Sequence, residues 1–439
     1  MKRIVIILLS VMAVTAAMGQ TQAPAPAVSG TVQDSPTAPT YVQNDKPLSG
    51  VEYQDIGLSS ASRNIFSPSF TMSSGWVSNA PRLAKGSSYE GSGLTSLSAS
   101  LLLNRDSKNN QTSLSYTGGG QIYTADSGLD AQFHALNVSE QYIAGRWTFL
   151  VADALTYQND AFITAPALLA PGLPGIGGFG YKPGVVPDES LIGQNIARIN
   201  NSSSGQFTYG FSRKTTFTGN FSYGLLHYID AGFLNSNQWN AGGGLDHRFG
   251  RNSVGFNYSL TRFSYDNYFE QFDSHNVQVV FSRVLTGRWS FQAGGGPSFV
   301  VTNFGPISDT KVYGGATAGF RYHRNNSDIG IRYSRAVTNG AGVVPGAITD
   351  TVGVDFSRKL SRSVSANLGG GYARNSGIYV NSGFNTFYVG TGLSHDLGRY
   401  STASIGYSLQ RQTGSNYAGL INQGVTVSLR WGFRPIVLH

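Results

Sequence analysis

Residues able to do acid–base or nucleophilic chemistry are few in this chain and poorly placed for it. There is no cysteine, which excludes a thiolate nucleophile, a thiolate metal site and a disulfide scaffold. Ser394-His395-Asp396 has the residue types of a catalytic triad. Neighbours on a strand point to opposite faces, so these three side chains cannot form one relay, and Asp246-His247-Arg248 fails for the same reason. We therefore expect a protein that is not an enzyme.

Metal, cofactor and nucleic-acid sites are also not indicated. The 7 histidines are scattered, with no His-Glu-x-x-His or comparable spacing. The Gly-Gly-Gly runs at 118–120, 242–244, 294–296 and 369–371 are not followed by Lys-Ser/Thr, so they are not phosphate loops. A formal net charge of +8 could suggest nucleic acid, but the Lys and Arg residues are dispersed and mostly flank turns. Anionic lipid headgroups, or a weak anion preference in a pore, explain the basicity better.

The elements that carry these residues have an unusual composition. Charged residues make up 12% of the 439 residues, about half the share in a soluble domain, while the hydrophobic fraction of 40% is ordinary. Gly, Ser, Thr, Asn and Tyr take the place of the charged residues. No Pro-rich or charged linker divides the chain after about residue 65, which predicts one large unit.

The first 65 residues differ from the rest. Lys2 and Arg3 precede an apolar run, and Ala17-Met18-Gly19 offers small residues where a signal peptidase cleaves, so residues 1–19 are expected to be an export signal. Residues 20–65 are rich in proline and poor in large apolar side chains. We expect them to form a disordered periplasmic tether.

From residue 66 onward, segments of 10 to 13 residues alternate with period two. In the clearest one, Val425, Val427, Leu429, Trp431 and Phe433 share one face, while Thr, Ser, Arg and Gly occupy the other. A soluble β-sandwich would carry Lys, Glu and Asp on its second face, because that face meets water. Here the second face is Gly, Ser, Thr, Asn and Gln with scattered Arg, which favours a transmembrane β-barrel with a polar lumen.

These features together resemble a bacterial outer-membrane β-barrel of the porin-like class. The resemblance rests on the signal segment, the absence of Cys, the strand-and-turn series from 66 to 433, and the final amphipathic strand ending in Trp431-Gly-Phe433. It implies an all-β fold, a transmembrane antiparallel barrel in the cell outer membrane, covering residues 66–439. It also implies short periplasmic turns and long extracellular loops.

The strand count can be argued from parity. Seventeen segments are recognisable by alternation, and bacterial single-chain barrels have an even number of strands. Phe66–Ser78 can supply the additional strand, so eighteen strands are expected, with sixteen as the alternative. The expected segments are 66–78, 93–104, 111–123, 129–142, 147–158, 203–212, 216–228, 237–249, 253–265, 274–285, 288–301, 311–322, 327–338, 347–359, 363–374, 384–396, 400–412 and 420–433.

One segment, 159–202, reads as neither strand nor turn, because it is rich in proline and glycine. The resemblance implies a loop that folds inward and narrows the channel. The alternative is an exposed surface loop that packs on its neighbours or binds a partner.

Alternation also places charged side chains on the polar face. Arg332, Arg430, Arg248, Asp246 and Asp355 are expected to line the lumen. If the 159–202 loop turns inward, its Asp188 and Glu189 would oppose some of these arginines and set up a transverse field. Structural pairing of each charge is the competing interpretation.

The function expected from this pattern is passive diffusion of small hydrophilic solutes across the outer membrane, with a weak anion preference. Two alternatives stay open: a non-conducting structural or surface-binding barrel, and a conduit for polymer export. Expected partners are outer-membrane lipid, the barrel-assembly machinery and small solutes, with no nucleic acid and no cofactor. Residues 20–65 are a candidate contact for a periplasmic partner, and a homo-oligomer is left open.

Overall fold

The structure is a computed structural model, and it describes residues 64–78, 91–124, 130–158, 197–229, 234–266, 271–304, 307–324, 326–338, 346–378, 383–414 and 417–437. The expected signal segment lies outside these ranges, as does the expected tether up to residue 63. No helix among the described residues is long and apolar enough to cross a membrane.

Strands account for nearly all of the described chain. They are β1 Ile65–Val77, β2 Ser92–Asp106, β3 Asn110–Tyr123, β4 Ala131–Ala144, β5 Trp147–Gln158, β6 Arg198–Gly210, β7 Thr215–Tyr228, β8 Ser236–Phe249, β9 Asn252–Tyr265, β10 Gln271–Val284, β11 Trp289–Phe304, β12 Ile307–Arg324, β13 Ser327–Thr338, β14 Ala347–Lys359, β15 Val364–Gly377, β16 Gly383–Asp396, β17 Ser401–Gly414, β18 Tyr417–Gly432 and β19 Ile436–Val437.

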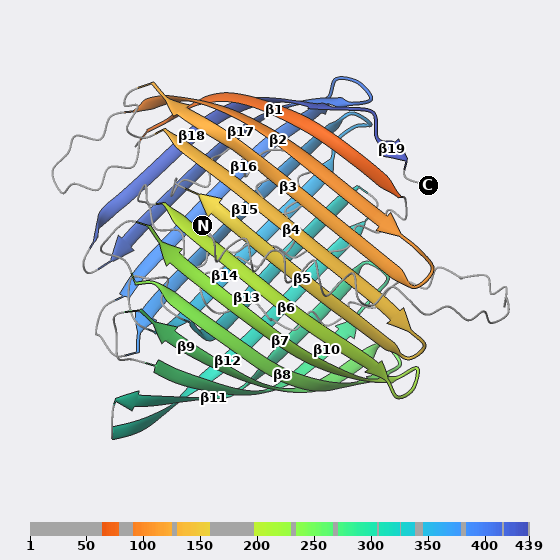
Figure 1. The fold of residues 1–439 in the computed structure, drawn as a ribbon, viewed down its shortest axis with the longest axis vertical. Coiled ribbons are helices and arrows are strands. Elements are labelled where there is room, and N and C mark those ends of the chain that lie inside the picture. The colour runs from red at the N-terminus through yellow and green to blue at the C-terminus, as the bar shows by residue number, and fades with distance from the viewer. Residues whose placement is uncertain are drawn as a thin grey trace, which may run out of the picture. The chain divides into compact units, whose positions relative to one another are not determined.

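The strands β1 to β18 form a closed barrel (Figure 1). Each strand pairs antiparallel with the next one in the chain, and β1 pairs with β18 from Ser69↔Gly432 to Val77↔Gly424. Because β1 pairs with β18, the sheet has no free edge along this joint. Closure of this kind lets the backbone N–H and C=O groups of a membrane-spanning sheet hydrogen-bond to one another. The expected eighteen strands are therefore confirmed, and the sixteen-strand alternative is wrong.

Most strands lie within four residues of their expected bounds, and two elements differ more. β6 begins at Arg198 rather than at residue 203, so the connection expected to span 159–202 ends at residue 197. On the outer face, this first part of β6 carries Ile199, Asn201 and Ser203. It therefore lacks the alternation of apolar and polar residues that predicts a strand. The short β19 extends the barrel's closing joint, because it pairs with Ile65 and Phe66 of β1.

The two ends of the barrel differ in their connections. At one end, called here the short-turn end, every connection between strands has four residues or fewer. Gly145 and Gly250 sit in two of these turns with φ of 62°, a left-handed conformation that a tight hairpin requires and that glycine adopts without strain. The other end, called the loop end, carries the longer connections. Two connections there are also short, at 305–306 and 415–416, because β11, β12 and β18 continue further.

The outer face of the barrel is apolar. Residues on it alternate with residues on the inner face along every strand, as in β18, where Val425, Val427 and Leu429 are 42%, 55% and 47% exposed while Thr426 and Ser428 are buried. An exposed apolar band of this kind is the surface that a bilayer covers.

Aromatic side chains mark both ends of this band. Trp147, Trp289 and Trp431 lie on the outer face near the short-turn end, and Trp76 and Trp239 lie near the loop end. Trp147 packs on Tyr209 with ring centroids 4.5 Å apart, and Trp289 packs on Tyr322 at 4.3 Å. Two rows of this type are typical of interfacial anchoring in membrane barrels.

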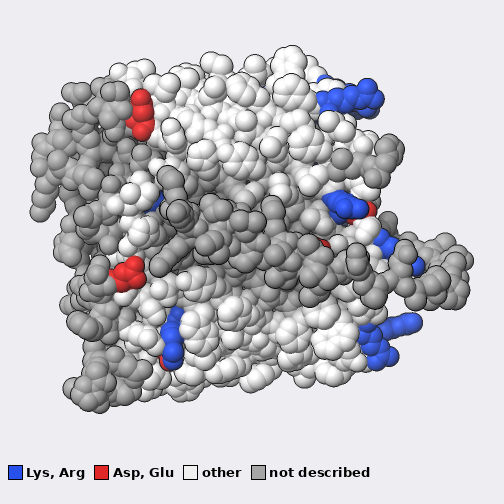
Figure 2. All heavy atoms as spheres, viewed as in Figure 1, with Lys and Arg blue, Asp and Glu red and all other residues white. Residues whose placement is uncertain are grey.

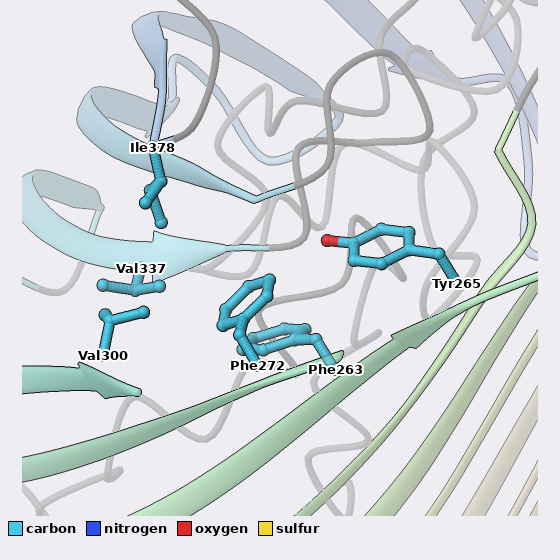
Figure 3. Close-up of a cluster of buried hydrophobic side chains, with 6 residues drawn as sticks. All are labelled: Phe263, Tyr265, Phe272, Val300, Val337 and Ile378. Carbon is cyan, nitrogen blue, oxygen red and sulfur yellow. The ribbon is translucent and has the colours of Figure 1, made fainter. Parts of the chain in front are cut away.

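The inner face is polar over most of its length. Hydroxyl and amide side chains bond across neighbouring strands, as in Ser404 to Ser428 at 2.5 Å and Ser100 to Thr117 at 3.0 Å. Near the loop end the inner face becomes apolar, and a buried cluster joins Phe263, Tyr265, Phe272, Val300, Val337 and Ile378 (Figure 3). The rings of Phe263 and Phe272 in this cluster are stacked 4.5 Å apart.

One joint of the barrel is paired over only part of its length. β12 pairs with β13 from Ala316↔Arg335 to Arg324↔Ser327, while it pairs with β11 from Ile307 to Tyr322. Beyond Arg335 the end of β13 leaves β12 and continues beside β14. Val337 then reaches the apolar cluster, which explains its burial to 1%.

Candidate functional site

Two groups of charged residues on the inner face lie on β12, β13 and β14. Arg332 and Asp355 lie on neighbouring strands, with the guanidinium Nη2 3.4 Å from the carboxylate Oδ1. Asp355 is 6% exposed, and Arg332 keeps 23% of its side chain exposed. The pair therefore places one guanidinium toward the enclosed space, partly neutralised by a buried acid.

A second charged group lies on the same face nearer the short-turn end. Asp328 accepts two hydrogen bonds from Arg321, at 3.3 and 3.0 Å, and its Oδ2 lies 2.8 Å from His323 Nδ1. Sequence reasoning did not single out these three residues, since they flank a turn. The alternation could have found them, because Phe320 and Tyr322 belong to the outer face and their neighbours Arg321 and His323 must point inward.

The remaining predicted residues lie on the same inner face but apart from this group. Arg430 on β18 places Nη2 3.4 Å from Ser69 Oγ of β1, at the closing joint. Asp246 and Arg248 lie two residues apart on β8, opposite Gly255 and Ser253 of β9. The structure thus brings Arg332 and Asp355 together and leaves Arg430, Asp246 and Arg248 at other places around the barrel. Asp188 and Glu189 lie outside the described residues.

Several buried polar atoms on the inner face have no hydrogen-bond partner among the described residues. Both amide atoms of Gln238 are in this state, as are Asn257 Nδ2, Asn200 Oδ1 and Asn422 Oδ1. A buried amide without a partner costs about 1–3 kcal/mol, so such atoms are ordinarily bonded to protein or water.

Four charged side chains of the outer face form two ion pairs. Arg262 and Asp273 form a bidentate pair at 2.6 and 2.8 Å, and Arg335 Nη1 lies 3.4 Å from Asp350 Oδ1. Asp153 differs, because its partners are the Ser203 hydroxyl at 2.5 Å and the Asn201 amide at 3.3 Å. No three His, Cys, Asp or Glu side chains of the described chain gather as they would around a metal ion.

A closed eighteen-stranded antiparallel barrel, apolar outside and polar inside with aromatic rows at both ends, has the fold of the porin-like class of outer-membrane β-barrels. No family model matches the chain, and no curated protein sequence matches it.

Solved structures with a similar arrangement of strands exist. OccK9 (OpdG) of Pseudomonas aeruginosa is 11% identical with a TM-score of 0.43, covering 84% of this chain and 98% of its own. OccAB4 of Acinetobacter baumannii is 8% identical with a TM-score of 0.43, covering 84% and 99%. The ferric-catecholate import receptor Fiu of E. coli is 9% identical with a TM-score of 0.44, covering 85% and 82%. All three TM-scores lie below 0.5, so the strand pairing and the two faces, rather than this likeness, define the class.

Proposed function

We propose that this protein is a passive diffusion channel for small hydrophilic solutes in the outer membrane. The observation that carries the proposal is the polar inner face of a closed barrel, where hydroxyl and amide side chains alternate with the apolar residues of the outer face. A polar inner face favours a hydrated lumen, and a continuous column of water is a path for ions and small polar solutes.

We also propose that the channel has a weak preference for anions over cations. Arg332, Arg430 and Arg248 contribute guanidinium groups to the inner face, and Asp355 and Asp246 offset part of that charge. A pore with a modest excess of positive charge along its wall favours anions over cations of similar size. Asp188 and Glu189 are proposed to oppose these arginines from the connection between β5 and β6.

Location and orientation follow the same proposal. Residues 1–19 would direct export, residues 20–65 would stay in the periplasm, and the barrel would be inserted by the assembly machinery. The short-turn end would face the periplasm and the loop end the outside, which is the usual arrangement in such barrels. The connection 159–197 would narrow the channel.

Single-channel current across a planar bilayer under a salt gradient tests the proposal. The refolded chain without residues 1–19 is compared with a version that also lacks residues 165–190. We expect steady conductance that rises on deletion, with a reversal potential on the anion side. Silence from both versions, with normal heat-modifiable migration on a gel, would contradict the channel and favour a structural or surface-binding barrel.

A further inference from the structure

A hollow of about 700 Å³ lies at the rim of the short-turn end, between two neighbouring turns. Its lining comes from the β10–β11 turn, from the first residue of β11 and from the last residues of β12. These residues are Thr286, Gly287, Arg288, Trp289, His323 and Arg324. The backbone ties the two sides together, because the His323 amide donates to the Arg288 carbonyl oxygen at 2.8 Å. The hollow is therefore part of the hydrogen-bonded sheet edge.

The charge of this hollow is positive. Arg288 and Arg324 are both exposed, and neither has an ion-pair partner among the residues that the structure describes. The nearby carboxylate of Asp328 pairs with Arg321 and His323. Its negative charge is therefore balanced by those two residues and not by Arg288 or Arg324. Two free guanidinium groups on either side of one hollow can bind a phosphate through bidentate hydrogen bonds.

An aromatic wall adjoins the hollow on the outer face. The ring of Trp289 packs against Tyr322 at 4.3 Å and against Phe320 at 4.9 Å. Tryptophan and tyrosine in this position lie at the level of lipid headgroups. The hollow therefore lies where the phosphate of a bilayer lipid lies, with apolar surface directly beside it for the acyl chains.

The wider rim is also basic. Figure 2 shows Lys and Arg atoms along the right-hand edge of the view, which is the short-turn end in Figure 1. Arg146, Arg213, Arg251, Arg362 and Arg399 all belong to its turns. A basic rim attracts anionic headgroups generally, and the Arg288–Arg324 hollow combines two arginines with the Trp289 wall in one lined concavity.

We propose that this hollow is a binding site for the phosphate of an anionic phospholipid headgroup, held by Arg288 and Arg324 against the Trp289 ring. The site fixes one lipid to the barrel at the short-turn end. It does not depend on whether the lumen conducts.

Native mass spectrometry of the refolded full chain in detergent, with added phosphatidylglycerol, tests the site. The variant pair Arg288→Gln and Arg324→Gln removes both guanidinium groups. The control pair Arg362→Gln and Arg399→Gln removes the same charge from turns without the hollow. We expect the first pair to lower the fraction of lipid-bound barrel at least fivefold and the control pair to change it less than twofold. Heat-modifiable migration on a gel checks that each variant is folded.

Three results would overturn the proposal. An equal loss in both pairs would mean that only the general charge of the rim attracts lipid. Retention of lipid in the Arg288 and Arg324 variant would mean that the hollow does not bind it. Competition by millimolar inorganic phosphate, as effective as competition by unlabelled lipid, would mean that the site binds a free anion rather than a membrane lipid.

Discussion

Three aspartates on the outer face show how individual side chains adapt to a surface that lipid covers. Asp273 is held by Arg262, and Asp350 by Arg335, so each carboxylate is neutralised by a guanidinium. Asp153 accepts hydrogen bonds only from neutral groups in the described structure, the Ser203 hydroxyl and the Asn201 amide. It lies six residues along β5 from Trp147, about 15 Å along the barrel axis for a tilted strand. A negative charge this far inside the apolar band of the outer face destabilises the barrel, because lipid cannot solvate it.

Replacing Asp153 with leucine is therefore expected to stabilise the protein. The free energy of unfolding should rise by about 1 kcal/mol, since a charged side chain on the lipid face costs on this order. Asp273→Leu is the matched control, and it should lower the free energy of unfolding by about 2 kcal/mol because Arg262 would lose its carboxylate. Denaturant titration of the barrel in lipid vesicles measures both. Destabilisation by Asp153→Leu would mean that this carboxylate meets a cation or a partner protein.

Which face a residue occupies could be worked out from the sequence for most of the candidate site. Arg332 and Asp355 lie on the inner face, where alternation places them, because a strand with one apolar face fixes the direction of every second side chain. Their contact could not be deduced, because it depends on the register between β13 and β14. Alternation likewise places Arg321, His323 and Asp328 on the inner face, but the contact among them depends on the register between β12 and β13.

Among the elements, strands with a strong apolar alternation were predictable and weakly patterned strands were not. β18 alternates valine, leucine and tryptophan with polar residues, and its range could be predicted to within a few residues. The first part of β6 is Arg-Ile-Asn-Asn-Ser and shows no such pattern, since both of its faces are polar. β19 has two residues, and only its pairing with β1 defines it as a strand. Whether such a segment forms a strand depends on the strand it pairs with. That information is not contained in the sequence of the segment itself.

The partly paired β12 leads to a prediction about backbone protection. From Ile307 to Gly315 it pairs with β11 alone among the described residues, so about half of its amides there have no strand partner. These amides should take up deuterium at least tenfold faster than those from 316 to 324. The matched control is 298–303 of β11, which pairs with both β10 and β12. Hydrogen exchange by mass spectrometry in micelles measures all three segments, and equal slow exchange would show that another segment covers the edge of β12.

At the scale of the whole molecule, closure between β1 and β18 holds the barrel together. These strands are separated by most of the chain, so their pairing cannot form until the sheet between them has formed. The absence of native cysteine allows a direct check, because an introduced pair has no competing thiol.

A disulfide across the joint is expected to form in the folded barrel. Ser73→Cys with Ser428→Cys, and Ser74→Cys with Val427→Cys, place cysteines directly opposite on two successive rungs. At least one pair should oxidise, and the boiled, unreduced chain should then migrate differently from the reduced one because it is a covalent ring. The control Ser73→Cys with Ser404→Cys places the second thiol on β17, one strand further away, and should not oxidise. Absence of a bond on both rungs would contradict the closed barrel.

The central claim is that the inner face lines a water-filled path for ions, and neighbouring residues of β13 test it most directly. Arg332 points to the inner face and Ile331, 44% exposed, to the outer face. Single-channel current is recorded for Arg332→Cys and for Ile331→Cys before and after a cationic methanethiosulfonate reagent. We predict that Arg332→Cys shifts the reversal potential toward cations and that the reagent restores it, while Ile331→Cys conducts like the unmodified protein and does not respond. No response at Arg332→Cys, or a response only at Ile331→Cys, would contradict a conducting lumen.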